Sequence, residues 1–236
     1  WVGGLHAVEE SIAAGTETVL EVLIERDSAK SPQLAALLAK CRQSGLKVRL
    51  ADRRELDRVA SGRHQGAAAR IAAPRRLDLR EFLRSLPEAR KKDTVLVALD
   101  QVQDPHNLGA ISRSAANLGA SGIIITEHRS SPVTPAAIAA SAGAIQKIQV
   151  FQVVNLSQAL AVCREAGFWI YGADAEGEPA WKTARNRPLV LVIGSEGEGI
   201  RRLVRESCDG LISIPQSAGG VESLNASCAA SVLLYE

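Results

Sequence analysis

The feature that most constrains this chain is a series of short, almost uninterrupted apolar runs in its last two thirds. Each run is rich in Val, Ile and Leu and is followed by a segment whose apolar residues have helical spacing. Strands that are apolar on both faces must be covered on both sides, and their alternation with helices is typical of a parallel sheet. The predicted strands are 94–99, 122–126, 148–154, 169–173, 189–193 and 211–214. The predicted helices between and after them are about 110–118, 135–144, 156–166, 200–206 and 223–234. The sequence therefore predicts an α/β fold with a parallel sheet.

The first third of the chain also alternates helical and strand patterns, but it ends before a charged stretch and predicts a separate, smaller α/β unit. Its predicted helices are 5–14, 32–44 and 54–60, and its predicted strands are 19–24, 47–51 and 67–72. The charged stretch 75–92 contains Pro87 and only a short amphipathic turn. We therefore predict a small domain over 1–76, a linker over 77–92 and a larger α/β domain over 93–236.

Charge is distributed unevenly along the chain, although the net charge is only +2. Residues 1–93 hold 18 Lys and Arg against 13 Asp and Glu, whereas residues 94–236 hold 10 against 13. Within residues 42–92 the counts are 15 basic against 6 acidic. Such a patch commonly neutralises phosphates, which favours a nucleic-acid partner for the first third. A solvated surface on a helical segment is an equally good reading of this stretch alone.

Two broad classes of protein do not fit the sequence. No run reaches the roughly 18 apolar residues of a membrane helix, and residues 1–10 lack a signal-peptide pattern, so we expect a cytoplasmic protein. The cysteines are far apart and form no Cys-x-x-Cys pair, which predicts buried thiols and no metal site. These cysteines are Cys41, Cys163, Cys208 and Cys228.

Ligands of parallel sheets bind at the carboxyl ends of the strands, and polar or glycine-rich segments follow three of the predicted strands. The first contains Asn107 and Gly109 and leads into a helix with Arg113 on its first turns. We expect Arg113 to project into the same crevice. The other two segments are 194–199 and 215–225.

The segment 194–199 has the order Gly-x-x-Gly-x-Gly, which differs from a dinucleotide fingerprint. Glu196 and Glu198 stand where a pyrophosphate would have to approach, so a phosphate ligand is electrostatically unfavourable. A cationic ligand that contains adenosine, such as S-adenosylmethionine, fits this loop better. The alternatives are a turn without ligand here, a surface charge at Arg113, and helix caps at Asn107 and Asn225.

Taken together, the three segments match one family. They form Asn-x-Gly-x-x-x-Arg, then Gly-x-Glu-x-x-Gly, then Ile-Pro followed by Ser-Leu-Asn-x-Ser, here residues 107–113, 194–199, 214–215 and 223–227. In this order the set resembles the SpoU (TrmH-like) family of RNA ribose 2′-O-methyltransferases in the SPOUT superfamily. Gly4–Glu9 and His64–Gly66 resemble the two ends of that family's ribosomal-protein-like RNA substrate-binding domain, so the resemblance covers nearly the whole chain.

The resemblance implies methylation of an RNA ribose 2′-hydroxyl by S-adenosylmethionine, and it is nearest to the branch acting on a guanosine of large-subunit ribosomal RNA. It also implies a deep C-terminal trefoil knot, a homodimer with the active site near the subunit interface, and no metal. The alternatives are a transfer RNA ribose methyltransferase, a ribosomal RNA methyltransferase that confers antibiotic resistance, and a catalytically silent RNA-binding assembly factor. Base methylation on the same scaffold is disfavoured, because the segment 107–113 belongs to the ribose branch.

The resemblance further assigns site residues. Backbone groups at Gly194, Ile214 and Leu224 are expected to hold the cofactor. The expected catalytic residues are Asn107, Arg113, Glu196 and Asn225. The family's role for Arg113 is that of proton acceptor, which is awkward because arginine stays protonated in proteins. Arg113 is therefore either transiently deprotonated in a dry site or clamps a neighbouring phosphate and orients the hydroxyl, and we favour the clamp.

Overall fold

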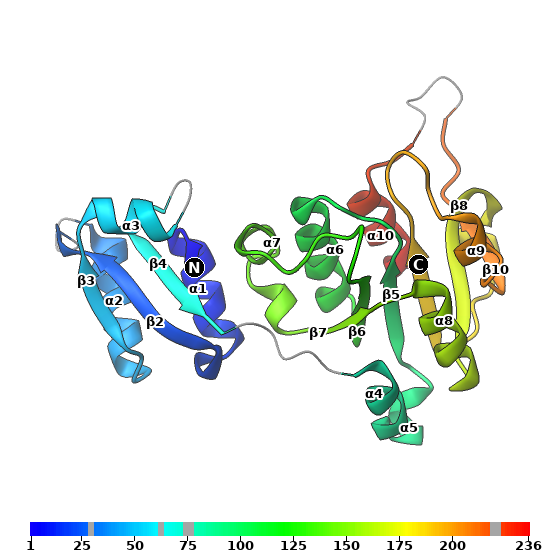
Figure 1. Ribbon diagram of the computed structural model, residues 1–236, viewed down its shortest axis with the longest axis horizontal. Helices are drawn as coiled ribbons and strands as arrows, with labels where there is room; N and C mark the ends of the chain where they lie inside the picture. The colour runs from blue at the N-terminus through cyan, green and yellow to red at the C-terminus, as the bar shows by residue number, and fades with distance from the viewer. Residues whose placement is uncertain (28–30, 61–63, 73–77, 218–222) are drawn as a thin grey trace.

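The chain folds around two separate β-sheets, which Figure 1 shows side by side. The coordinates are a computed structural model that describes residues 1–27, 31–60, 64–72, 78–217 and 223–236. Among these residues, none of the helices combines the length and apolar character needed to cross a bilayer.

The larger sheet has six strands in the order β10-β8-β9-β5-β6-β7, and every neighbouring pair is parallel. The predicted parallel α/β fold is thus confirmed. The strands are β5 (Val95–Leu99), β6 (Gly122–Thr126), β7 (Gln149–Val153), β8 (Trp169–Pro179), β9 (Leu189–Ile193) and β10 (Gly210–Ser213). Because β5 and β9 are central neighbours, the segments that follow them leave the sheet at the same edge.

Successive residues of β5 point to opposite faces and enter two different cores. Val97 and Leu99 pack with α6 (Pro105–Asn117), α7 (Pro135–Ala140) and α10 (Ala226–Tyr235), together with the short turn η3 (Ala144–Gln146). Leu96 and Ala98 pack with α8 (Leu156–Glu165) and α9 (Arg202–Arg205). A further short turn, η4 (Ala180–Lys182), follows β8. Helices on both faces explain why the strands are apolar throughout.

The smaller sheet has the order β1-β4-β2-β3, with β2 and β3 parallel and the other pairs antiparallel. Its elements are β1 (Val2–Gly3), α1 (Leu5–Ala14), η1 (Thr16–Thr18), β2 (Val19–Glu25), α2 (Pro32–Gln43), β3 (Val48–Ala51), α3 (Arg53–Val59) and β4 (Ala67–Ile71). The two-residue strand β1 was not predicted. Its Val2 is buried in the core of the larger sheet, so the two units are packed together.

The segment predicted as a linker differs in the structure from an extended connection. Residues 79–91 form α4 (Leu79–Ser85) and α5 (Glu88–Lys91), and α4 begins at Asp78, whose carboxylate accepts a hydrogen bond from Glu81 N at 2.9 Å. Leu79 and Leu83 are buried in the core that contains α8. These two apolar side chains therefore make α4 part of the larger unit.

Candidate active site

Helix α6 begins earlier than predicted, and this changes the environment of Asn107. Asp104 caps the helix by accepting a hydrogen bond from His106 N at 2.8 Å, and Pro105 occupies the first turn. Asn107 therefore lies inside α6 and is not its cap. Its side chain is buried, with 8% of the residue exposed, and its amide is available for partners outside the helix.

The three motif segments meet through one hydrogen-bonded cluster of Asn107, Glu196 and Asn225. Asn107 Nδ2 donates to Glu196 Oε1 at 2.7 Å, and Asn225 Nδ2 donates to Asn107 Oδ1 at 3.0 Å and also to Glu196 Oε1. Asn225 additionally caps α10, because its Oδ1 accepts from Ser227 N at 2.8 Å. The helix-cap alternative thus holds for Asn225 alongside its place in the cluster.

The loop that carries Glu196 is closed by two backbone hydrogen bonds. Ser195 N donates to Gly199 O and Gly199 N donates to Ser195 O, each at 3.1 Å. Gly199 has φ +66°, which other residues adopt at a cost. A Cβ at Gly194 would lie 2.1 Å from the carbonyl carbon of Gly199. These two glycines are therefore required for the loop to turn back and present Glu196.

Sequence reasoning missed Asp100, which directly follows β5. Its side chain is fully buried, and it accepts hydrogen bonds from Arg201 N and Nε at 2.8 Å each, with Arg201 Nη2 at 2.6 Å. The pair fixes the residue that follows the 194–200 loop against the end of β5. An aspartate immediately after an apolar strand was the available signal, but its partner lies 101 residues away.

A cavity of about 770 Å³ lies between this loop, the end of β8 and the segment after β10. The three residues expected to hold the cofactor, Gly194, Ile214 and Leu224, all line it. Its walls also include Ile193 and Ile212, and backbone from the 194–200 loop borders it. Apolar walls beside exposed backbone groups suit an adenine ring, which is recognised by stacking and by amide hydrogen bonds.

The charged side chains at this cavity are mainly acidic. Asp174 and Glu176 extend from β8 and hold Arg205, with Asp174 Oδ2 3.2 Å from Arg205 Nε and Glu176 Oε2 2.7 Å from Nη2. The hydrogen bond that Arg205 donates to Glu176, followed by the charge of Asp174, raises the pKa of Arg205. Glu196 and Glu198 add two further carboxylates. A cationic sulfonium or ammonium group therefore fits this cavity electrostatically.

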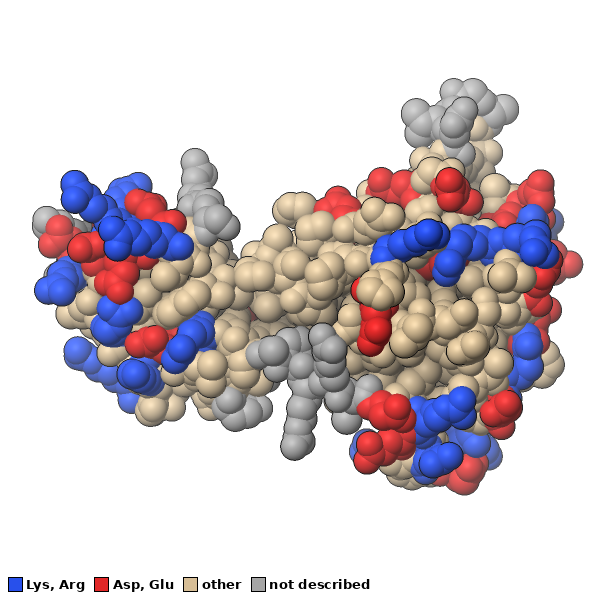
Figure 2. All heavy atoms as spheres, in the orientation of Figure 1, with Lys and Arg blue, Asp and Glu red and all other residues tan. Residues whose placement is uncertain are grey.

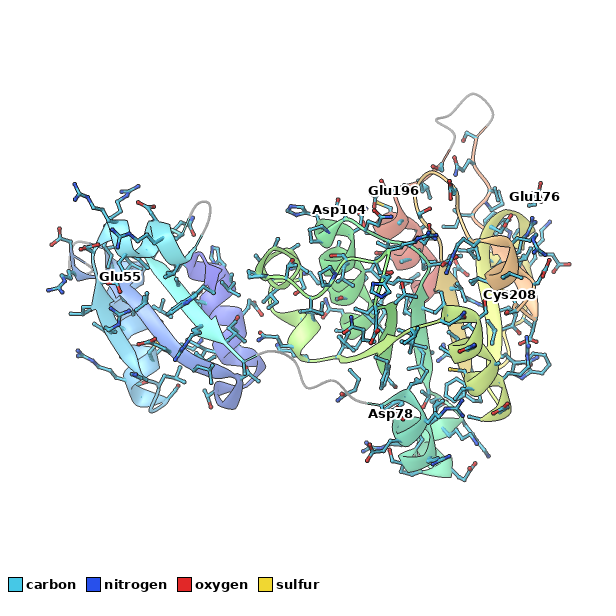
Figure 3. The ribbon with its side chains drawn as sticks, in the orientation of Figure 1. Glu55, Asp78, Asp104, Glu176, Glu196 and Cys208 are labelled. Carbon is cyan, nitrogen blue, oxygen red and sulfur yellow. The ribbon has the colours of Figure 1, made fainter. Side chains whose placement is uncertain are left out.

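A second, smaller cavity of about 230 Å³ adjoins the first and shares Ser195 and Glu196 with it. Its other walls include Gln101, Asp104 and Asn107. Figure 3 shows Asp104 and Glu196 at the same upper edge of the larger unit. The Asn107–Glu196–Asn225 cluster thus lies between a large acidic cavity and a small polar one.

The structure does not place Arg113 in this crevice, so that expectation is wrong within a single chain. A six-residue separation on a helix turns the side chain about 120° away from Asn107 and moves it about 9 Å along the axis. Arg113 is exposed and lines a different pocket of about 280 Å³ with Glu10, Asn117 and Lys147.

The prediction of buried thiols holds for only part of the cysteines. Cys41 and Cys163 are buried, Cys208 is partly buried, and Cys228 is exposed on α10. Burial raises the pKa of Cys163 to about 12, and burial with the charge of Asp209 raises that of Cys208 to about 12.

Two family profiles match almost the whole chain. The SpoU rRNA methylase family matches residues 94–235, and the family described as RNA 2′-O ribose methyltransferase substrate binding matches residues 1–77. The chain belongs to the SpoU rRNA methylase family. It is therefore an RNA 2′-O-methyltransferase that uses S-adenosylmethionine.

Named relatives agree with this membership over nearly their whole lengths. The 23S rRNA (guanosine-2′-O-)-methyltransferase RlmB of Xanthomonas campestris is 42% identical, with 100% of this chain and 94% of that protein covered. A Bacillus subtilis relative, YacO, is 39% identical with the same coverage, and its name leaves the RNA open as "tRNA/rRNA methyltransferase". The solved structure of the SpoU methyltransferase AviRb from Streptomyces viridochromogenes with the cofactor AdoMet has a TM-score of 0.80 at 25% identity, covering 99% of this chain and 87% of that one.

Proposed function

We propose that this SpoU family enzyme methylates the ribose 2′-hydroxyl of a guanosine in large-subunit ribosomal RNA. The observation that carries the proposal is the pair of adjoining cavities that share Ser195 and Glu196, since one suits the cofactor and the other a ribose. The choice of RNA rests on the RlmB relatives, which are 42% identical along the full chain.

The large cavity is proposed to hold S-adenosylmethionine through backbone groups at Gly194, Ile214 and Leu224. When bound, the cofactor supplies a methyl group on a positively charged sulfur. The protein's contribution is alignment, because an in-line attack by the ribose oxygen requires both reactants in fixed positions. The acidic side chains at the cavity, Glu196 among them, stabilise the cofactor's positive charge.

Asn107, Glu196 and Asn225 are proposed to position the target ribose. Glu196 accepts hydrogen bonds from both asparagines, so its carboxylate is fixed between the two cavities. The remaining acceptor capacity of this carboxylate can take a hydrogen bond from a ribose hydroxyl. We assign the three residues to the catalytic site on this basis.

We further propose that the chain acts as a homodimer in which Arg113 of one copy serves the site of the other. Arg113 is separated from the cluster within one chain, although the family resemblance assigns it to the reaction. The layer formed by α6 and α10 carries exposed apolar side chains, with Val232 44% and Tyr235 80% exposed. Such residues suit an interface between copies. Arg113 would then act as the clamp, gripping a phosphate beside the target ribose with its planar fork.

The proposal includes the domain assignment 1–76, 77–92 and 93–236, with the first part binding RNA, and a C-terminal trefoil knot. The knot is supported by the path of the chain after β10. This strand lies at the edge of the sheet beside β8, yet α10, which follows it, packs on α6 and contacts β9. The two ends of this connection, β10 and α10, therefore lie at different places on the sheet.

The sharpest test mixes two inactive variants, Arg113→Ala and Asn225→Ala. If Arg113 acts across the interface, a mixed dimer contains one intact site, and random mixing restores about a quarter of the wild-type methyl transfer. If both residues act in one chain, mixed dimers have no intact site and activity stays absent. Each variant alone should bind S-adenosylmethionine in calorimetry, with the affinity of Arg113→Ala equal to wild type.

The RNA itself is identified by mapping ribose methylation in a deletion strain. Loss of one guanosine 2′-O-methyl group in large-subunit ribosomal RNA is the expected result. Loss in a transfer RNA instead, or a change in antibiotic sensitivity, would assign the enzyme to the corresponding alternative. Unchanged methylation in both kinds of RNA would contradict the proposed substrate.

A further inference from the structure

A third hollow, of about 360 Å³, lies on the opposite face of the larger sheet from α6 and α10. It runs between the start of α8, the segment after β6 and the start of α9. Arg129, Arg201 and Arg202 line it with His128, and the described lining contains no Asp or Glu. We call this hollow the arginine groove. Its composition is opposite to that of the acidic cofactor cavity.

The groove belongs to a wider basic stripe. Figure 2 shows Lys and Arg side chains side by side across the upper part of the larger unit, over α9 and toward the segment after β6. A row of cations along a surface, rather than a single cation, fits a ligand with repeated negative charges.

Two of the three arginines of the groove form ion pairs within the protein. Arg201 is fixed by the buried Asp100, as described above. Arg202 Nη1 lies 2.5 Å from Glu206 Oε1, one helical turn on, and both side chains are exposed. A ligand therefore meets at least Arg201 in an already ordered conformation, which lowers the entropic cost of binding.

The backbone at the groove is also held in an unfavourable conformation. Gln101 and Arg129 both line it and have φ of +61° and +60°, where residues with a side chain are uncommon. Hydrogen bonds from Thr126 Oγ1 to His128 O at 2.6 Å and with Ser130 Oγ at 2.7 Å fix the segment around Arg129. Two such residues at one groove are typical of a functional surface.

Exposed apolar side chains stand beside the arginines. Val154 is 76% exposed and Leu203 is 59% exposed, and both line the groove. A small inorganic anion makes no use of them. A nucleotide strand does, because its bases and sugars offer apolar faces next to its phosphates.

The groove leads to the proposed catalytic site. Gln101 lines both the groove and the small cavity, and that cavity shares Glu196 with the cofactor cavity. We propose that the arginine groove binds the sugar–phosphate backbone of the substrate RNA strand next to the target nucleotide, so that the target ribose enters the small cavity beside Gln101. This inference rests on the proposed function and adds an RNA contact outside residues 1–76.

The test removes two groove charges and leaves Arg201 intact, because Arg201 neutralises a buried carboxylate. The double variant Arg129→Gly and Arg202→Gln keeps the positive φ at residue 129 without strain. The matched control is Lys182→Gln with Arg187→Gln, which removes the same charge from exposed residues before the amino end of β9. The probes are a labelled oligouridylate and a large-subunit ribosomal RNA transcript, titrated with the full chain at several salt concentrations.

For the oligouridylate, the slope of log binding constant against log salt should fall by about 0.7 for each groove arginine and stay unchanged in the control. Equal slopes in the two double variants would overturn the proposal. A second outcome would also overturn it: the wild-type chain binds polyglutamate tightly, and the groove variant loses this binding but keeps RNA binding. The surface would then be assigned to an acidic protein. Calorimetry with S-adenosylmethionine separates a failure of this inference from a failure of the proposed function. If the wild-type chain does not bind S-adenosylmethionine, the proposed function is contradicted, whatever the RNA slopes show.

Discussion

At the residue scale, Asp100 is the residue near the site whose structural role the sequence indicated least. It lines neither of the two cavities, yet it fixes Arg201 between the 194–200 loop and the arginine groove. We expect Asp100→Ala to lower the free energy of unfolding by about 3 kcal/mol, at the low end for a broken buried pair because Arg201 is 40% exposed and regains water. Urea unfolding measures this loss. The control Asp78→Ala removes an exposed helix cap and should cost about 1 kcal/mol; an equal loss in both variants would show that the pair is not an anchor.

A second residue-scale prediction concerns Cys163, whose pKa burial raises to about 12. An unfolded thiol titrates near ~8.5, so the folded state holds its proton more tightly. This contribution to stability is complete below about pH 8.5 and is lost as the pH rises toward 12, at up to about 1.4 kcal/mol per pH unit. The free energy of unfolding of Cys163→Ala, measured with denaturant, should therefore fall less between about pH 8.5 and alkaline pH than that of the wild-type protein. Cys228→Ala, at an exposed site, should follow wild type, and parallel curves for all three proteins would refute the assignment.

Residue identities in the cluster were predictable, whereas their distances were not. The resemblance to the SpoU family picked out Asn107, Glu196 and Asn225, and the segments that carry them converge because they follow buried strands at one sheet edge. The direction of Arg113 depended on where α6 begins, and a start at residue 110 rather than Pro105 hid the fact that Arg113 and Asn107 lie on one helix and point apart. The partner of Asp100 was out of reach because local patterns carry no information about a contact 101 residues away.

At the element scale, prediction was best where burial is complete. The bounds of β6 and β9 agree with the apolar runs, since a fully buried strand must be apolar from end to end. Strand β8 continues to Pro179 through polar residues, because its second half pairs with the edge strand β10 and is partly exposed. Helix α4 was underestimated because only Leu79 and Leu83 are buried among charged neighbours.

Helix α4 yields a prediction about fragments. Residues 78–236 and 93–236 both keep every residue of the two cavities, but only the first keeps Leu79 and Leu83. Burial of two leucines stabilises a fold by about 3–6 kcal/mol. The free energy of unfolding of the longer fragment, measured in urea, should therefore be higher by that amount. The longer fragment should also bind S-adenosylmethionine in calorimetry. Equal stability of the fragments would show that residues 77–92 act only as a linker.

At the scale of the whole molecule, the two units are expected to share the work of RNA binding. Deleting residues 1–76 removes most of the basic stretch 42–92 and should weaken binding to ribosomal RNA transcripts and flatten its salt dependence, because each lost phosphate contact lowers the slope by about 0.9 on duplex. The fragment should keep the slope contributed by the arginine groove. Filter binding at several salt concentrations measures the affinity and its salt dependence. An unchanged slope would contradict a role of the first unit in binding RNA.

The cluster of Asn107, Glu196 and Asn225 also determines when, during translation, the enzyme can first form its catalytic site. Its members are separated by 89 and 118 residues along the chain, so no local segment can assemble it. At about 5–20 residues per second, roughly ten seconds pass between the addition of Asn107 and that of Asn225. Contacts of such long range form slowly, because loop closure precedes any gain from them. A nascent chain can therefore present its basic first unit to RNA well before it can transfer a methyl group.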